Sequence, residues 1–460
     1  MRLWKLHPWK TVLLGGTIAL LGWLGWRYAD QRKPTLLALN TTTGKLQWVQ
    51  PLAPDIGYSK GPIVGDGKVF LGACVDDAVK GFSAYRLQAF DAQSGRFLWA
   101  LQPQRTTIPY DLASNEAVSI QDGQLYLQLE NELQAIDPAT GKQRWAIPRR
   151  WFFAPVNVWY GIGLISRPNA LVVLNSNGKE RVLQTLDPKT GKVLKQIPRS
   201  LGKLTTTRNL ITADDRTLFL ETSGLVPADS PNTFLDSGIS TITAYDIKTL
   251  QTRFRAITGN IVHLQAVGDA LQLSTNLNYD PKTRKLSDGK ILAVSAESGQ
   301  LLWQKTKHQL QCPGSYFKQI DNDTVYLNCS GYPGTVSRNE QNSRVVVAVS
   351  AQTGDVKWQA RISPNRYSDN LPAAVNAHQY LTFRNVLKSN VSQTQAIALD
   401  RQTGKLLWTF PLFDPEARYV DTWQSIVAAE GDRFFTLDVL PRWQLWLLQM
   451  NRHWYVKQAL

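Results

Sequence analysis

Short stretches of alternating apolar and polar residues, separated by turns rich in glycine and aspartate, follow one another along most of the chain. For example, residues 61–64 and 68–72 alternate on either side of a glycine-containing turn at 65–67, and the same form recurs at 117–129. Alternation with a period of two predicts β-strands, and turns of this kind join strands into hairpins. The pattern therefore predicts an all-β protein made of consecutive hairpins.

Every second hairpin carries a motif that occurs eight times without gaps, with the shared pattern Ala-x-Asp-x-x-Thr-Gly-x-x-x-Trp and a spacing of about fifty residues. Such spacing indicates a repeat architecture. Leu250 takes the glycine position in the fifth repeat, and Lys195 and Phe254 take the tryptophan position in the fourth and fifth. The motif glycines are Gly44, Gly95, Gly141, Gly191, Gly299, Gly354 and Gly404. The motif tryptophans are Trp48, Trp99, Trp145, Trp303, Trp358 and Trp408.

Each part of the motif has a physical role in a hairpin. The Asp, Asn or Ser that ends the first strand can cap the following turn with its side chain. The glycine supplies the positive φ that closes the hairpin. With the upstream hairpin, each repeat contributes four strands. We therefore expect an eight-bladed β-propeller with four-stranded antiparallel blades, preceded by one N-terminal transmembrane helix.

The motif resembles the tryptophan-docking motif of the eight-bladed quinoprotein dehydrogenases and their non-catalytic relatives. The resemblance covers residues 36–460. It implies that each motif tryptophan lies between blades, stacked on the neighbour's glycine peptide and small alanine. For Trp99, it implies a contact near Ala38 or Gly141.

The two ends of the propeller complement each other. The first motif, in residues 36–49, lacks an upstream hairpin, whereas residues 424–439 predict a hairpin without a motif. We expect these segments to share one blade, which would close the ring and protect its last sheet edge.

Before the repeats, residues 11–26 form an uncharged apolar run between Lys10 and Arg27, with aromatic residues at both ends. This composition predicts a membrane-spanning signal anchor. A cleaved signal peptide is the alternative, although no small-x-small cleavage site follows the run. An anchor would place the propeller on the periplasmic or an equivalent extracytoplasmic side. The expected division is a tail at 1–10, the anchor at 11–29, a linker at 30–35 and the propeller at 36–460.

The formal net charge is +15. Basic residues are spread singly, with no run beyond Arg149-Arg150, which argues against nucleic acid as a partner. A basic surface favours contact with anionic lipid or with acidic proteins.

The three cysteines leave two alternatives open. Cys312 and Cys329 fall at the open end of a predicted hairpin, where a disulfide would be reasonable in geometry. Cys74 would then be unpaired. The alternative is three buried thiols.

The longest connections all fall on the face opposite the Thr-Gly turns, and loops on a rigid scaffold commonly bind partners. Two of these connections contain arginine and aromatic residues, which are common at interface hot spots. The same side chains could instead pack as core. The candidates for binding other proteins are Arg149, Arg150, Trp151, Phe152, Phe153, Phe413, Arg418 and Tyr419.

Two functions compete. The first is a non-catalytic scaffold, similar to the propeller lipoprotein of the outer-membrane β-barrel assembly machinery, although the lipid-bearing cysteine of that family is absent. The second is a dehydrogenase that uses pyrroloquinoline quinone and Ca²⁺. No two cysteines are neighbours, so the adjacent-Cys disulfide usual in such enzymes is missing, and the five histidines show no metal-ligand spacing. We therefore expect no catalysis, cofactor or metal. Residues that could line the channel mouth of a dehydrogenase are Asn115, Glu116, Asn260, His263, Asp421 and Trp423.

Overall fold

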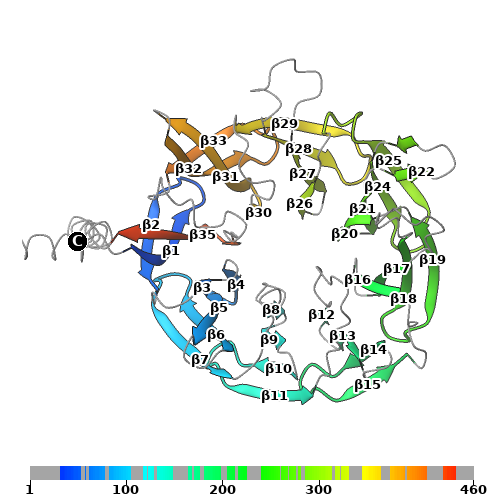
Figure 1. The fold of residues 1–460 in the computed structure, drawn as a ribbon, viewed down its shortest axis with the longest axis horizontal. Helices are drawn as coiled ribbons and strands as arrows, with labels where there is room; N and C mark the ends of the chain where they lie inside the picture. Colours follow the sequence, from blue (N-terminus) through cyan, green and yellow to red (C-terminus); the bar gives the residue numbers. More distant parts are fainter. Residues whose placement is uncertain are drawn as a thin grey trace, which may run out of the picture.

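The chain folds into a ring of antiparallel β-sheets, a β-propeller, in which each sheet has one strand near the middle and one at the rim (Figure 1). The computed structural model describes residues 32–441 except 53–56, 59–61, 78–81, 105–117, 122, 129–131, 149–163, 168–169, 177–180, 198–204, 213–215, 225–239, 259–260, 268, 276–277, 281–284, 288, 313–315, 322, 331–343, 364–372, 389–390 and 412–427. All regular structure in these residues is β-strand.

The described residues of the ring form seven four-stranded sheets and one five-stranded sheet, and a separate two-stranded hairpin, β22–β23, is inserted in the chain. The strands from the first half of the chain are β1 (Arg32–Asn40), β2 (Leu46–Pro51), β3 (Gly57–Tyr58), β4 (Ile63–Gly65), β5 (Lys68–Asp77), β6 (Phe82–Asp91), β7 (Phe97–Gln104), β8 (Val118–Gln121), β9 (Gln124–Gln128), β10 (Glu132–Ile136), β11 (Gln143–Pro148), β12 (Leu164–Arg167), β13 (Ala170–Ser176), β14 (Arg181–Leu186), β15 (Val193–Gln196), β16 (Thr205–Thr212) and β17 (Thr217–Gly224). Those from the second half are β18 (Ser240–Asp246), β19 (Thr252–Thr258), β20 (Ile261–Val267), β21 (Ala270–Thr275), β22 (Asn278–Asp280), β23 (Lys285–Ser287), β24 (Lys290–Ser295), β25 (Leu301–Thr306), β26 (Tyr316–Asp321), β27 (Thr324–Ser330), β28 (Arg344–Ser350), β29 (Val356–Ser363), β30 (Ala373–Val375), β31 (Gln379–Lys388), β32 (Val391–Asp400), β33 (Leu406–Pro411), β34 (Ala428–Glu430) and β35 (Arg433–Pro441).

The motif turns have the chemistry that their residues predict. In the turn after β6, the Asp91 carboxylate accepts hydrogen bonds from the amide and hydroxyl of Ser94, each at 2.7 Å. All seven motif glycines have a positive φ, between 67° and 74°. The turn of the first hairpin lies at the same end of the sheet, because Ala92 N donates to Gly67 O at 2.9 Å. We call this end of the ring the turn end and the opposite one the loop end.

The first and last described hairpins share one sheet, in the order β2-β1-β35-β34, so the ring is closed by pairing β1 with β35 from Arg32↔Pro441 to Asn40↔Arg433. β1 begins at Arg32, within the range 30–35 that the sequence predicts as a linker. The side chain of Thr35 is fully buried, and Pro34 lies opposite Val439 in the ladder. Charged residues and a proline suggest a loop, but β35 supplies the pairing that makes them a strand.

The predicted anchor at 11–29 lies outside the described residues, as do residues 442–460. Within the described ranges, no helix is long and apolar enough to cross a membrane.

The hydrophobic core lies between neighbouring sheets. One cluster joins three consecutive sheets through Tyr326 on β27, Tyr380 on β31 and Phe434 on β35, all fully buried. The rings of Tyr326 and Tyr380 are 4.8 Å apart between centroids. Each sheet therefore depends on both neighbours for its burial, as in other repeat architectures.

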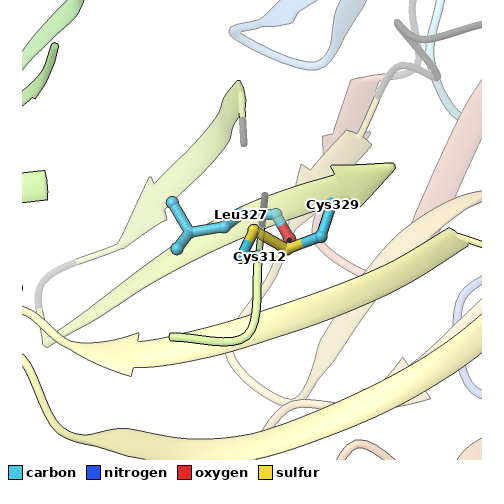
Figure 2. Close-up of a disulfide and its surroundings, with 3 residues drawn as sticks. All are labelled: Cys312, Leu327 and Cys329. Atoms are coloured by element: carbon cyan, nitrogen blue, oxygen red, sulfur yellow. Dashed lines mark hydrogen bonds between the residues drawn. A yellow bond between two sulfur atoms is a disulfide. The ribbon is translucent and has the colours of Figure 1, made fainter. Parts of the chain in front are cut away.

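A disulfide joins Cys312, in the connection between β25 and β26, to Cys329 on β27 (Figure 2). Both residues are buried in the cluster between these two sheets. Cys74 is on β5, and its side chain lies outside the described set. The disulfide fixes a connection between sheets to the second strand of the sheet that follows.

Replacing both Cys312 and Cys329 with serine should lower the free energy of unfolding by roughly 3 kcal/mol, because the cross-link closes a loop with a sequence separation of 17. Chemical denaturation with and without reductant measures this change. Reductant should destabilise the natural chain and leave the double variant unchanged. Equal midpoints for the natural chain and the variant under non-reducing conditions would contradict the assigned role.

Candidate functional site

Neighbouring sheets are joined at the rim by the motif aromatic of one sheet and the motif glycine of the next. A Cβ added to any of these glycines would come within 2.5–2.8 Å of the aromatic ring, so only glycine fits. The pairs are Trp48 on Gly95, Trp99 on Gly141, Trp145 on Gly191, Phe254 on Gly299, Trp303 on Gly354, Trp358 on Gly404 and Trp408 on Gly44. The last pair links the final motif to the first.

The indole N–H groups add a directional bond to these contacts. Trp145 Nε1 donates to Pro188 O at 2.8 Å, and Trp303 Nε1 donates to Ala351 O at 2.8 Å. Trp408 Nε1 donates to Thr41 O across the closure of the ring. The Phe254 ring lies on Gly299 in the same way, but phenylalanine has no side-chain N–H group to donate. The rim is thus held by packing and by hydrogen bonds that fix the position of each ring.

We call each contact between neighbouring sheets at the rim a seam. At one seam, both motif positions depart from this scheme. Lys195, at the tryptophan position of β15, is exposed, and Leu250, at the glycine position of the next sheet, is buried with a φ of 54°. Leu250 packs with Leu183 of the preceding sheet. A leucine from one sheet therefore fills the space that a tryptophan from its neighbour fills at the other seams.

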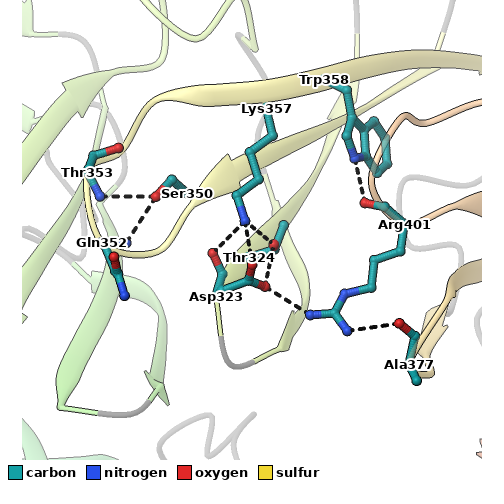
Figure 3. A network of polar contacts seen from close by, with 9 residues as sticks. All are labelled: Asp323, Thr324, Ser350, Gln352, Thr353, Lys357, Trp358, Ala377 and Arg401. Atoms are coloured by element: carbon teal, nitrogen blue, oxygen red, sulfur yellow. Dashed lines mark hydrogen bonds and ion pairs between the residues drawn. The ribbon is translucent and has the colours of Figure 1, made fainter.

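At the turn end, an ion-pair network links the β26–β29 sheet to the β30–β33 sheet (Figure 3). The Asp323 carboxylate pairs with Lys357 Nζ at 2.7 Å in its own sheet and with Arg401 Nη2 at 2.9 Å in the next. Arg401 also donates to Ala377 O at 3.3 Å. The hydrogen bond from Lys357, assisted by bonds from Thr324 and Arg401, lowers the pKa of Asp323 to about 2.

This pKa predicts a pH dependence. A carboxylate whose pKa falls from 3.8 in the unfolded chain to about 2 in the fold stabilises the protein above about pH 4. That contribution is lost as the pH falls towards 2. Unfolding midpoints measured across this range should fall less steeply for Asp323→Asn than for the natural chain. Because the Asp323 side chain is 55% exposed, the difference should be small and should shrink in high salt. Identical pH profiles would show that the network adds no stability.

The rim near the turn end also carries exposed large apolar side chains, which were not predicted from the sequence. They are 40–57% exposed and lie at the start of the outermost strands, at Phe97, Val193, Leu194, Leu301, Leu302, Val356, Leu406 and Leu407. A signal for them exists in the sequence. In three repeats, two successive apolar residues begin the outermost strand, where its register against the neighbouring strand shifts by one residue.

The residues predicted to bind partners, Arg149, Arg150, Trp151, Phe152, Phe153, Phe413, Arg418 and Tyr419, lie outside the described residues. So do the channel-mouth candidates Asn115, Glu116, Asn260, Asp421 and Trp423. His263 is on β20, but its side chain lies outside the described set. Among the residues that are described, no group of three His, Cys, Asp or Glu side chains could hold a metal ion.

The structure does show which strands the long connections of the loop end join. The long connections join β7 to β8 (105–117), β11 to β12 (149–163), β17 to β18 (225–239), β27 to β28 (331–343) and β33 to β34 (412–427). At the turn end, the motif turns are short and alike, for example from Asn40 to Leu46. The two ends of the ring therefore differ greatly in connection length.

Comparison with known proteins gives three further findings. A family model described as outer membrane protein assembly factor BamB matches residues 2–151 and 178–393. The quinohemoprotein alcohol dehydrogenase ADH-IIG of Pseudomonas putida is 31% identical over 134 residues, which are 27% of this chain and only 17% of that enzyme. Among solved structures, BamB from Moraxella catarrhalis is 13% identical with a TM-score of 0.48 over 77% of this chain and 93% of that one. The quinohemoprotein alcohol dehydrogenase from Comamonas testosteroni is 10% identical with a TM-score of 0.47 over 90% and 77%.

Proposed function

This chain belongs to the family of outer membrane protein assembly factor BamB, and from that membership we propose that it is a non-catalytic scaffold that binds other proteins through its loop end. In this proposal, the eight large sheets are the eight blades of a closed propeller. The family description suggests a role in the assembly of membrane proteins.

The observation that carries the proposal is the difference between the two ends of the ring. The strands of every sheet are fixed by packing on both neighbours, whereas the long connections vary in length and composition from one sheet to the next. A rigid ring with variable loops on one end suits recognition, because the loops are held in place without cost to the core. The arginine and aromatic residues at 149–153 are the contacts that we expect to dominate.

We further propose that residues 11–29 anchor the chain in a membrane and that the ring lies on the periplasmic or an equivalent side. The Cys312–Cys329 disulfide supports this placement, since structural disulfides are typical of oxidising compartments. β1 ends at Asn40, where a motif turn begins, so Arg32 lies at the loop end. An anchor just before Arg32 would hold the loop end near the membrane surface, where membrane proteins and anionic lipid are within reach.

A site-specific photo-crosslinker tests the scaffold role in intact cells. Placed at Phe152 of the full-length chain, it should give one discrete protein adduct. Placed at Gln402, an exposed residue of a motif turn, it serves as the matched control and should not give that adduct. The same adduct from both positions, or none from Phe152, would refute binding through the loop end.

The alternative function is a dehydrogenase that uses pyrroloquinoline quinone and Ca²⁺, favoured by the 134-residue similarity to a quinohemoprotein dehydrogenase. Since the described residues supply no metal-ligand group and the channel-mouth candidates lie outside them, we derive no step through the cofactor. Titration of the full-length chain with the quinone and Ca²⁺ decides between the two functions. Saturable quenching of tryptophan fluorescence would favour the enzyme, with Glu116 and Asp421 as the first residues to replace.

A further inference from the structure

The outer strand of the β12–β15 sheet differs from every other outer strand of the ring. β15 is four residues long, and all four side chains are exposed. The other outer strands each carry a motif aromatic packed against the next sheet, whereas β15 has Lys195 at that position. Val193 and Leu194 are 53% and 57% exposed. Without an aromatic anchor, the side chains of β15 are left at the surface.

The backbone of β15 is also open on one side. Among the described strands, β15 ends its sheet and pairs only with β14, and it lies at the rim in Figure 1. Ile197 N donates inward to Leu183 O at 3.0 Å. Because inward and outward groups alternate along a regular antiparallel strand, and the register of β15 shifts only before Lys195, the N–H and C=O groups of Gln196 point to the free edge. Such groups are a template for a further strand.

Positive charge gathers around this edge. Lys189, Lys192 and Lys195 are all exposed. Leu250 of the next sheet packs in the same cluster as Ile197, and Lys248, two residues before Leu250 in the same turn, is also exposed. In the described part of the chain, none of these four lysines takes part in an ion pair. The nearby Asp187 carboxylate accepts hydrogen bonds from its own turn, from Lys189 N at 2.7 Å.

We propose that this edge binds an extended, acidic segment of a partner protein, which adds to β15 as a fifth strand. Open main-chain groups would supply the pairing, the exposed Val193 and Leu194 would contact apolar side chains of the segment, and the lysines would select for Glu and Asp. The site is at the rim near the turn end, away from the long loops. It therefore does not depend on the loop-end proposal, and either can fail while the other stands.

The lysines also have a role when no partner is bound to β15. Lysine on an exposed edge strand discourages pairing with other chains. An acidic strand is the one kind of partner for which these lysines attract instead of repel. The sign of the partner's charge is thus the property that an experiment must test.

The test uses the full-length chain and a fluorescent probe peptide that alternates glutamate and valine. Fluorescence anisotropy should show saturable binding that is roughly tenfold weaker for Lys192→Glu/Lys195→Glu. Lys405→Glu is the matched control. It lies beside the exposed pair Leu406 and Leu407 on β33 but in a sheet anchored by Trp408, and it should leave binding unchanged.

A second probe tests the strand pairing without any change to the protein. The same peptide with N-methyl groups on alternate residues keeps its charge but cannot pair along that edge, and it should not bind. Three outcomes would overturn the proposal. They are equal binding of the methylated peptide, an equal loss for Lys405→Glu, and binding of phosphatidylglycerol vesicles through Lys192 and Lys195 with no binding of either peptide.

Discussion

Trp48→Ala is expected to lower the free energy of unfolding by about 3–5 kcal/mol. Trp48 is 2% exposed, and its ring lies against Gly95 of the next sheet. Its indole N–H donates to Ala92 O at 3.1 Å, and its ring centroid is 5.8 Å from that of Phe435. The alanine variant would therefore leave a cavity between two sheets and an unsatisfied carbonyl. The loss should be large because the sheet that contains the first and last described hairpins depends on this contact.

Denaturant titration of both proteins measures the difference, with Lys195→Ala as the control. Lys195 holds the same motif position in another sheet but is exposed, so its replacement should change stability by less than about 0.5 kcal/mol. If the two variants lost the same stability, the motif position would not act through packing on the neighbouring sheet.

Leu250→Gly is expected to destabilise the fold by about 2–4 kcal/mol, although it places glycine where glycine is the motif residue. Leu250 is 7% exposed and packs with Leu183 and Leu218, so its removal leaves a cavity at a seam that has no tryptophan. Relief of its positive φ of 54° offsets roughly 1 kcal/mol of the loss. If Leu250 did not pack across the seam, Leu250→Gly would leave the free energy of unfolding in a denaturant titration unchanged or higher.

The compensating variant is Lys195→Trp. Alone, it should add little stability, because Leu250 has a Cβ where the other seams have glycine. At those seams, a Cβ on the glycine would lie within 2.5–2.8 Å of the aromatic ring. Combined with Leu250→Gly, it should restore about 1–3 kcal/mol through the new contact. A double-mutant cycle measures this coupling. Additive effects would show that the two positions do not meet across the seam.

The repeat made much of the fold predictable. Its period and its Asp and Gly positions led to an all-β protein of four-stranded antiparallel sheets, because the motif Asp caps the turn and the motif Gly closes it within one hairpin. It could also have been predicted that Lys195 and Leu250 belong to the same seam. If each motif tryptophan contacts the glycine of the following repeat, then two departures in consecutive repeats belong to one seam.

Other features depend on contacts that the motif does not encode. Asp323 is in a first-hairpin turn, where the repeats have no common sequence, so its pairing with Arg401 required the structure. The exposure of Leu301 and Leu406 is set by their place on an outermost strand. The residues proposed for partner binding sit in connections with no repeated pattern at all, and their arrangement stays a prediction.

The pairing of β1 with β35 has a consequence for how the ring is made. These strands are the most distant in sequence of any that pair, from Arg32↔Pro441 onward, and loop closure over such a separation is slow. During synthesis, β1 and β2 emerge first, yet the buried side chains of Leu36, Leu37 and Leu39 have no inner strand to cover them until the C-terminal hairpin is complete. The nascent chain must keep its first hairpin from aggregating for nearly the whole of translation. A truncation near the C-terminus would consequently unfold the beginning of the protein as well as its end.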